Sequence, residues 1–205
     1  IMVINKAWLD KLNLPIPSTA DEFYATMKAF KENDMTGNGD TEDEIPLEFS
    51  KSNWAAQIMN LANPWGIAGR NQHNDSHYFM VKDGKAVPTM DTEEFRAFLE
   101  FHHKLASEGL LDVRGFDQAN DEYYAKLKEG RVGCYLAWTP NSNFDAEIAK
   151  NWVVVPPFKA MDGVEPVKTG QRNRIKANMF GISFSAECKN IEAALTWWNY
   201  LSSTT

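Results

Sequence analysis

Helix and strand signals alternate irregularly along this chain, and its well-marked helix starts constrain the fold most. Thr19 and Glu22 form a capping box, the pattern by which a helix start satisfies its own backbone N–H groups. Apolar residues then recur at helical spacing from Phe23 to Phe30. The pattern predicts a helix over residues 20–31, whose apolar face must be buried against another element.

The remaining signals predict a mixed fold. Asp91 and Glu94 form a second capping box, and the helix that it starts is expected to end at Gly109. The Asp83-Gly84 step predicts a tight hairpin. The other predicted ranges are strands over 2–4, 78–81, 132–138, 152–155 and 180–184 and helices over 120–129 and 191–201, with weaker helical signals over 53–61 and 144–149.

Composition and the lack of linkers favour a single domain. The 205 residues are 43% hydrophobic and 24% charged, which is typical of a globular protein. No internal repeat and no linker rich in Pro, Gly or Ser divides the chain. We therefore expect one compact, helix-rich α/β or α+β domain over residues 1–205.

The charge of the chain argues against a nucleic-acid-binding protein. Its formal net charge is −7, and its Lys and Arg residues form no basic stripe.

No apolar stretch is long enough to span a bilayer, and no signal-peptide pattern opens the sequence. Residues 1–5 read like the interior of a strand, so we expect the chain to be a piece of a longer protein. Two cysteines, Cys134 and Cys188, predict no disulfide framework. So few cysteines are compatible with a cytosolic protein and with an exported one.

An acidic segment over residues 34–44, DMTGNGDTEDE, has the spacing of a calcium-binding loop. Side-chain oxygens occur at every second residue, as in loops that wrap a hard cation. The alternative is a solvated acidic turn, because Gly, Asn and Asp also dominate ordinary turns. The residues with this spacing are Asp34, Thr36, Asn38, Asp40 and Glu42.

The segment departs from an EF-hand at its end. Counted from Asp34, Gly39 falls at the sixth position, where the sharp turn is needed, but the twelfth position is Ile45 instead of a bidentate Glu. Pro46 then disfavours the exiting helix. Any closing carboxylate must come from the Glu42–Glu44 stretch, which also contains Asp43. We therefore expect a static structural clip and not a calcium sensor.

Tryptophans at loop edges indicate a carbohydrate site. Trp138 lies in AWTPNSN, close to Asn141, and Trp65 lies in NPWG. An aromatic ring beside amide and hydroxyl groups is typical of a sugar-binding wall, because a sugar ring stacks on the aromatic face while its hydroxyls are hydrogen-bonded. Arg172 and Arg174, in GQRNR, offer paired donors for a carboxylate or for hydroxyls. The alternatives are rings that cap the core and a solvated arginine loop.

Sequence-visible catalytic motifs are absent. The chain has no GxSxG elbow, no HExxH helix, no phosphate-binding GxxxxGK loop and no CxxC pair. This pattern favours a binding protein over an enzyme. Two alternatives stay open: a glycoside-processing enzyme domain, in which the aromatics line subsites and two carboxylates act as acid and base, and a purely structural calcium module.

Four segments in order resemble one protein family. They are NKAWLDKLNLPIPSTADEFYATMKAFKE, DMTGNGDTEDEIPLEF, EGRVGCYLAW and FGISFSAECKNIEAALTWWNYL. The chain is identified over nearly its whole length as similar to the extracellular solute-binding lipoproteins of bacterial ABC importers for oligosaccharides. The resemblance implies the type II periplasmic-binding-protein-like fold, with this chain as the second of two lobes and the first lobe and C-terminal end missing.

The resemblance also implies structural Ca²⁺ in the acidic segment, because family members bind calcium through a DxDGNGxxDEIP loop. The carried-over ligands are Asp34, Thr36, Asn38, the Asp40 carbonyl and a closing carboxylate pair. One extra residue precedes that pair in this chain. Either Asp43 and Glu44 close the site, or Glu42 and Asp43 do.

For function, the resemblance implies capture of an oligosaccharide without covalent chemistry. The sugar is expected to bind in the cleft between two lobes and to be delivered to the permease subunits of an ABC transporter. The full-length protein is expected to be a monomer that an N-terminal lipid holds on the outer side of the membrane.

Overall fold

The computed structural model describes residues 1–67, 79–82, 84–139, 149–167, 184–185 and 187–202. The chain divides into two compact units, Ile1–Gly170 and Gln171–Thr205. The second unit contains helix α6 (Ile191–Ser202), and every other helix and strand named below belongs to the first unit. No helix among the described residues is both long and apolar enough to cross a membrane.

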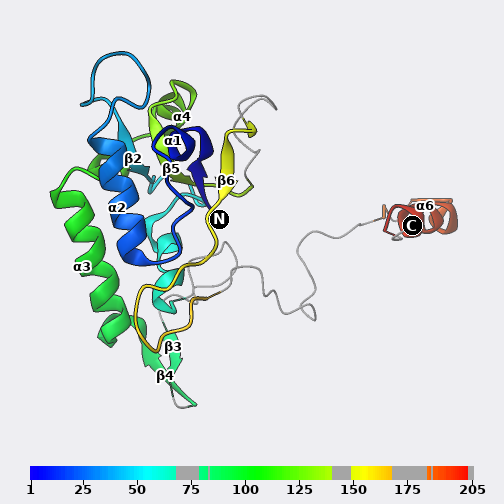
Figure 1. Ribbon diagram of the computed structural model, residues 1–205. Helices are drawn as coiled ribbons and strands as arrows, with labels where there is room; N and C mark the ends of the chain where they lie inside the picture. The colour runs from blue at the N-terminus through cyan, green and yellow to red at the C-terminus, as the bar shows by residue number, and fades with distance from the viewer. Residues whose placement is uncertain (68–78, 83, 140–148, 168–183, 186, 203–205) are drawn as a thin grey trace. The chain divides into compact units, whose positions relative to one another are not determined.

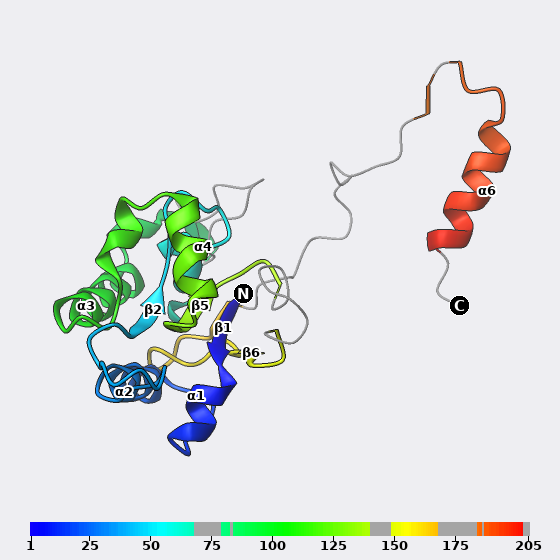
Figure 2. The ribbon, with the colours of Figure 1, turned by 90° about the horizontal axis from the view of Figure 1, so that it is seen from above.

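A mixed four-stranded sheet forms the centre of the first unit (Figures 1 and 2). Its strand order is β2-β5-β1-β6. The first strand of the chain therefore lies inside the sheet, antiparallel to both of its neighbours, while β2 pairs in parallel with β5. The strands are β1 (Met2–Asn5), β2 (Ile45–Glu48), β5 (Val132–Leu136) and β6 (Trp152–Val154).

Helices α2 and α3 lie on the same side of this sheet (Figures 1 and 2). The first unit contains the α-helices α1 (Lys6–Lys11), α2 (Ala20–Lys31), α3 (Glu93–Ser107) and α4 (Asn120–Lys128). Strands β3 (Phe79–Lys82) and β4 (Lys85–Pro88) form the predicted hairpin. The mixture of helix and sheet confirms the predicted fold class.

The helix starts are close to those predicted from the caps. The Thr19 hydroxyl accepts a hydrogen bond from the Glu22 backbone N–H at 3.2 Å, and α2 has the predicted bounds. Helix α3 differs by one residue, because Thr92 instead of Asp91 caps it and accepts from the Phe95 N–H at 3.3 Å. The weak helical signal over 53–61 corresponds only to a short 3-10 helix at its end, Ile58–Leu61. The signal over 144–149 and the strand predicted over 180–184 lie almost entirely outside the described residues.

Two elements were not predicted from sequence. Strand β2 contains Pro46, which disfavours a central strand, but β2 is the end strand of the four-stranded sheet, and its outer side pairs only through a single bridge between Leu47 and Leu111 among the described residues. Leu47 donates its backbone N–H to the Leu110 carbonyl, and Ile45 donates to Arg131. Helix α1 is only six residues long, and its start depends on the Asn5 side chain accepting backbone N–H groups.

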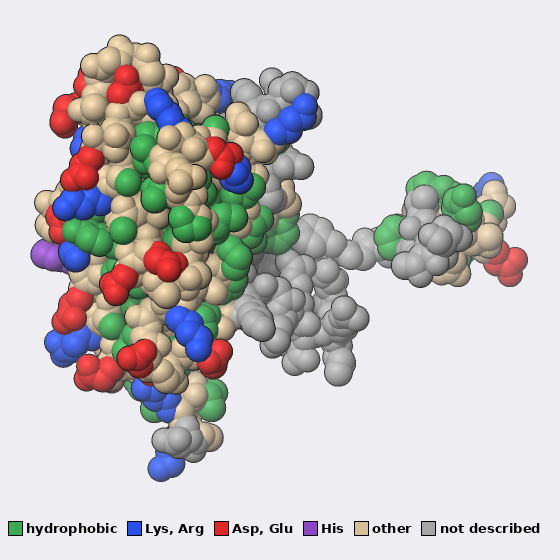
Figure 3. All heavy atoms as spheres, in the orientation of Figure 1, with side chains coloured by type: hydrophobic (Ala, Val, Ile, Leu, Met, Phe, Trp, Pro, Cys, Tyr) green, Lys and Arg blue, Asp and Glu red, His purple; other side chains and the backbone are tan. Residues whose placement is uncertain are grey.

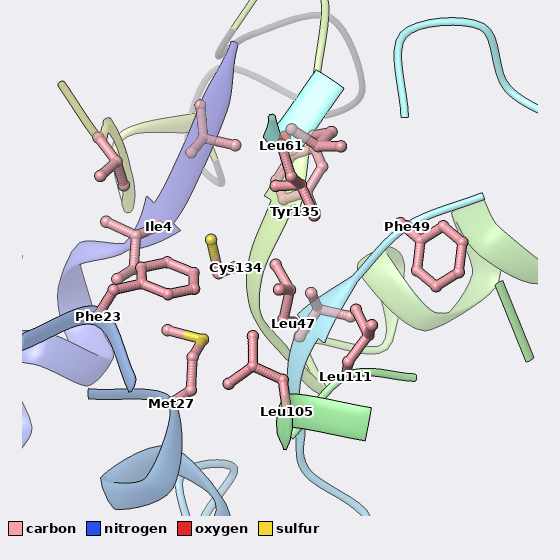
Figure 4. Close-up of a cluster of buried hydrophobic side chains, with 14 of the residues drawn as sticks. Ile4, Phe23, Met27, Leu47, Phe49, Leu61, Leu105, Leu111, Cys134 and Tyr135 are labelled. Atoms are coloured by element: carbon pink, nitrogen blue, oxygen red, sulfur yellow. The ribbon is translucent and has the colours of Figure 1, made fainter. Parts of the chain in front are cut away.

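The hydrophobic core lies between the sheet and the α2–α3 side (Figure 4). Phe23 and Met27 of α2 point into it, as their spacing predicts, and meet Leu105 of α3 and Cys134 of β5. The core is closely packed at Gly133, where a Cβ atom would lie 2.5 Å from Cδ2 of Phe30. The core therefore leaves no room for a side chain at this glycine.

Charged side chains of both signs are interspersed on the face of the molecule in Figure 3, and the described Lys and Arg residues form no continuous basic patch there. This distribution agrees with the acidic net charge of −7. On this face, the described residues therefore form no positive stripe of the kind that binds a nucleic-acid backbone.

Candidate functional site

An aromatic pocket with a cavity of about 210 Å³ lies where three segments of the first unit meet. The segment after β2 contributes Trp54, helix α4 contributes Tyr124, and the end of β5 leads into Trp138. We call these lining residues the aromatic pocket: Asn53, Trp54, Ala55, Tyr124, Leu136, Ala137 and Trp138.

Two tryptophan rings form one corner of the aromatic pocket. The ring centroids of Trp54 and Trp138 are 5.0 Å apart, and the ring planes are inclined by 58°. This separation leaves no space for a ligand between the rings, so a ligand would stack on their outer faces. Trp138 is 55% exposed and Trp54 is 40% exposed, which leaves those faces accessible. The corner is suited to an apolar sugar face.

The polar groups of the aromatic pocket are neutral and held in place. The Asn53 side-chain amide donates to the Tyr124 hydroxyl at 2.8 Å, and its carbonyl oxygen accepts from the Ala55 N–H at 3.0 Å. Asn53 keeps a second amide hydrogen, and the Tyr124 hydroxyl keeps its own proton to donate. These donors could hydrogen-bond the hydroxyl or ring oxygens of a sugar.

Trp65 lies in the core and not in the aromatic pocket. It is 2% exposed and packs against Phe98, Phe101 and His102, with ring centroids 5.1 to 5.5 Å away. Burial lowers the pKa of His102 to about 4, so its ring is neutral and belongs to the same apolar cluster. The ring of Trp65 is therefore not available to a ligand, and we do not include it in the proposed site.

Sequence reasoning missed Trp54, Asn53 and Tyr124. Trp54 follows Asn53 directly, the same pairing of a ring with an amide that marked Trp138, but residues 53–61 carried a weak helical signal instead. Tyr124 is adjacent to the pocket only through the tertiary fold. Three predicted ligand-binding residues lie outside the described residues: Asn141, Arg172 and Arg174.

The acidic segment folds around the carboxylate of Asp34. Asp34 Oδ1 accepts from the backbone N–H groups of Gly37 at 2.6 Å and Asn38 at 3.2 Å, and Oδ2 accepts from Gly39 at 2.8 Å. These hydrogen bonds, that of Gly39 above all, lower the pKa of Asp34 below its usual value. Gly37 and Gly39 both have positive φ angles, 80° and 87°, which a tight loop around a carboxylate requires.

Glu44 and Asp43 close the acidic segment from its other end. Glu44 is 3% exposed, and its Oε1 accepts from the backbone N–H groups of Met35 at 2.8 Å and Thr36 at 3.2 Å. Asp43 Oδ2 accepts from the Asn38 side-chain amide at 2.8 Å. The second oxygens, Glu44 Oε2 and Asp43 Oδ1, are buried without a hydrogen-bond partner. Buried carboxylate oxygens without partners are costly, and a cation would satisfy them.

Glu42 and Asp40 point their carboxylates elsewhere. The Glu42 side chain is 83% exposed and lies 3.3 Å from the ammonium of Lys31 in α2. Asp40 Oδ1 accepts from the Glu42 backbone N–H at 2.8 Å. Of the two predicted ways of closing the loop, the geometry therefore favours Asp43 with Glu44.

The donors of the acidic segment fit a hard cation. Among the described residues, no three His, Cys, Asp or Glu side chains converge into a preformed cluster. The segment instead combines carboxylates with amide, hydroxyl and backbone carbonyl oxygens, the ligand set that calcium accepts and that softer metals do not favour. The two unpartnered buried oxygens are the observation that supports this fit.

Comparison with known proteins finds substrate-binding proteins of ABC transporters. No protein-family model matches the chain. The fructooligosaccharide ABC transporter substrate-binding protein FusA of Streptococcus pneumoniae is 29% identical over 199 residues, which are 95% of this chain and 34% of FusA. The chain therefore spans about a third of the length of this relative.

Similar solved structures are proteins of the same kind. An extracellular solute-binding protein from Bifidobacterium longum subsp. infantis matches with a TM-score of 0.70 and 34% identity, over 80% of this chain and 34% of that protein. An EF-hand mutant of S. pneumoniae FusA in complex with fructo-nystose matches with a TM-score of 0.67 and 30% identity, over 78% of this chain and 31% of that protein. The chain is therefore similar, over about a third of their length, to substrate-binding proteins of ABC transporters, and it has the type II periplasmic-binding-protein-like fold.

Proposed function

We propose that the protein containing this chain binds an oligosaccharide and delivers it to an ABC transporter without transforming it. The observation that carries the proposal is the exposed corner of Trp54 and Trp138 beside the neutral donors of Asn53 and Tyr124. Stacking on the rings would supply affinity, and the fixed donors would orient the sugar. FusA, a relative at 29% identity, is a fructooligosaccharide-binding protein, which supports the same class of ligand.

The proposal places this chain as the second lobe of a two-lobed protein. The aromatic pocket would then form one wall of an interlobe cleft, and the missing lobe would form the other wall. Lobe closure on the sugar would create the shape that the permease subunits recognise. As an extracellular solute-binding protein, it would act as a monomer and be tethered to the membrane by an N-terminal lipid.

We further propose that the acidic segment binds a structural calcium ion. Asp34, Asn38, Asp43 and Glu44 would hold it, together with the Thr36 hydroxyl and backbone carbonyls such as that of Asp40. When bound, calcium would neutralise the Asp43 and Glu44 carboxylates, each of which has a buried oxygen without a partner, and fix the segment that leads into β2. An EF-hand mutant of FusA is 30% identical to this chain, and the EF-hand named for that relative supports cation binding in this class of protein.

Isothermal titration calorimetry with the full-length protein tests the sugar proposal. A panel of short fructooligosaccharides is titrated into wild type, Trp54→Ala and Trp138→Ala. Loss of a central aromatic contact typically costs at least about 2 kcal/mol, so we expect about thirty-fold weaker binding in each variant. Trp65→Phe is the matched control, since Trp65 is buried and its conservative replacement should leave affinity unchanged.

Three results would contradict the proposal. One is a wild-type protein that binds no oligosaccharide of the panel. Another is unchanged affinity in both pocket variants. The third is recovery of shortened sugar after incubation, which would favour the glycoside-processing alternative.

A further inference from the structure

A buried polar network joins β2 to α4, the helix that contributes Tyr124 to the aromatic pocket. Glu48 at the end of β2 and Lys126 of α4 are almost fully buried, and their side chains pair at 3.1 Å. Lys126 also pairs with Asp112, and its ammonium donates to the Gln118 side-chain carbonyl at 2.7 Å. These four side chains are the buried network, and they join β2 to α4.

Gln118 is the one member of the buried network that reaches the segment leading to Trp54. Its side-chain amide donates to Glu48 Oε1 and to the Phe49 backbone carbonyl, both at 2.7 Å. Its own backbone carbonyl accepts from the Ser52 hydroxyl at 3.0 Å. Residues 48–52 are thus attached at three points to Gln118, which lies two residues before the start of α4.

The same helix then contacts the other two walls of the aromatic pocket. The Tyr124 hydroxyl accepts from Asn53, and the neighbouring Tyr123 hydroxyl donates to the Leu136 backbone carbonyl at 2.7 Å. Tyr123 is fully buried, so this hydrogen bond is shielded from water. A shift of α4 relative to residues 48–54 would therefore change the distance between Tyr124 and Trp54, which lie on different walls of the aromatic pocket.

We propose that Gln118 is a positioning residue for the aromatic pocket. Its hydrogen bonds hold residues 48–52, which lead to Trp54, against the stretch of chain just before α4. Its hydrogen bonds to this segment go to Glu48, Phe49 and Ser52, and none of these three residues lines the pocket. An apolar residue of similar size would fill the same space but could not make these hydrogen bonds. This inference rests on the proposed sugar-binding function.

The test compares Gln118→Met with wild type in the full-length protein. Below the melting temperature, the variant should bind fructooligosaccharides at least ten-fold more weakly. The fluorine NMR signals of fluorotryptophan at positions 54 and 138, assigned through Trp54→Phe and Trp138→Phe, should shift in the absence of sugar. Ser52→Ala removes only the hydrogen bond from the Ser52 hydroxyl to the Gln118 carbonyl, so it should cause a smaller loss of affinity and smaller fluorine shifts. If Gln118→Met does not fold, Ser52→Ala is used as the test variant instead.

Leu105→Ala is the matched control, because Leu105 is fully buried in α3 and is not among the residues that line the aromatic pocket. It should lower the melting temperature and leave both affinity and the two fluorine signals unchanged. A folded Gln118→Met protein with wild-type affinity and unchanged signals would overturn the inference. If wild type binds no sugar of the panel, the proposed function fails, while the fluorine signals still decide whether Gln118 positions the rings.

Discussion

Replacing Glu44 by Gln separates the two roles of this residue in the acidic segment. The substitution keeps the side-chain shape and an oxygen that can accept from Met35 and Thr36, but it removes the charge. Without a cation, the wild-type protein contains a buried, unpartnered Glu44 oxygen, which costs about 1–3 kcal/mol. The variant carries no such buried charge, so we expect its cation-free stability to equal or exceed that of wild type by up to about 1 kcal/mol.

With calcium the order should reverse. A cation present at about 100 times its dissociation constant stabilises the folded state by about 2.7 kcal/mol. For a protein of this size, about 2–4 °C of melting temperature correspond to 1 kcal/mol, so wild type should gain about 5–11 °C. Glu44→Gln should gain less than about a third of this, since a neutral amide binds calcium far more weakly than a carboxylate.

Thermal melts followed by circular dichroism, in chelator and in millimolar calcium, measure both effects. Glu42→Gln is the matched control, because the Glu42 carboxylate is exposed, faces Lys31 and should leave the calcium response intact. Two outcomes would refute the reasoning: a wild-type protein that does not respond to calcium, or a Glu44→Gln protein with the full response. Loss of the response in Glu42→Gln alone would show that Glu42 and Asp43 close the loop instead.

Two further predictions concern stability. Gly133→Ala should lower the melting temperature by several degrees, since overpacking costs about 1–3 kcal/mol, and Phe30→Leu in the same protein should restore part of the loss. Burial raises the pKa of Glu48 from 4.5 to about 7, so the folded state holds an extra proton between these values, and its stability should fall as pH rises through this window. Chemical denaturation at pH 5 and pH 8 should show this fall in wild type but not in Glu48→Gln, and equal pH dependence in the two proteins would contradict it.

Local chemistry made the helices predictable from sequence. The caps at Thr19 and Thr92 and the apolar spacing from Phe23 to Phe30 act within one or two helical turns, so the sequence alone contains the signal. Strand β2 was missed for the opposite reason. Pro46 disfavours a strand locally, and only the position of β2 at the sheet edge makes it acceptable.

The candidate site was also predictable from sequence only in part. Trp65 and Trp138 have similar neighbours in sequence, but α3 packs over the first and not over the second. The spacing of oxygens around Asp34 was readable from sequence, whereas the choice between Glu42 and Glu44 depends on whether the side chain faces Lys31 or the backbone of Met35. Burial is a property of the tertiary fold, and a single sequence does not determine it for a ring beside a turn.

The position of β1 inside the sheet has a consequence for folding. Met2 pairs with Leu136 and Val3 with Val154, so β1 finds its partners in strands that lie far from it along the chain. Helices α2 and α3 can form before these strands pair, with their apolar faces uncovered. Closing this long loop should limit the folding rate, and the apolar faces of α2 and α3 should be prone to aggregation until the sheet has formed.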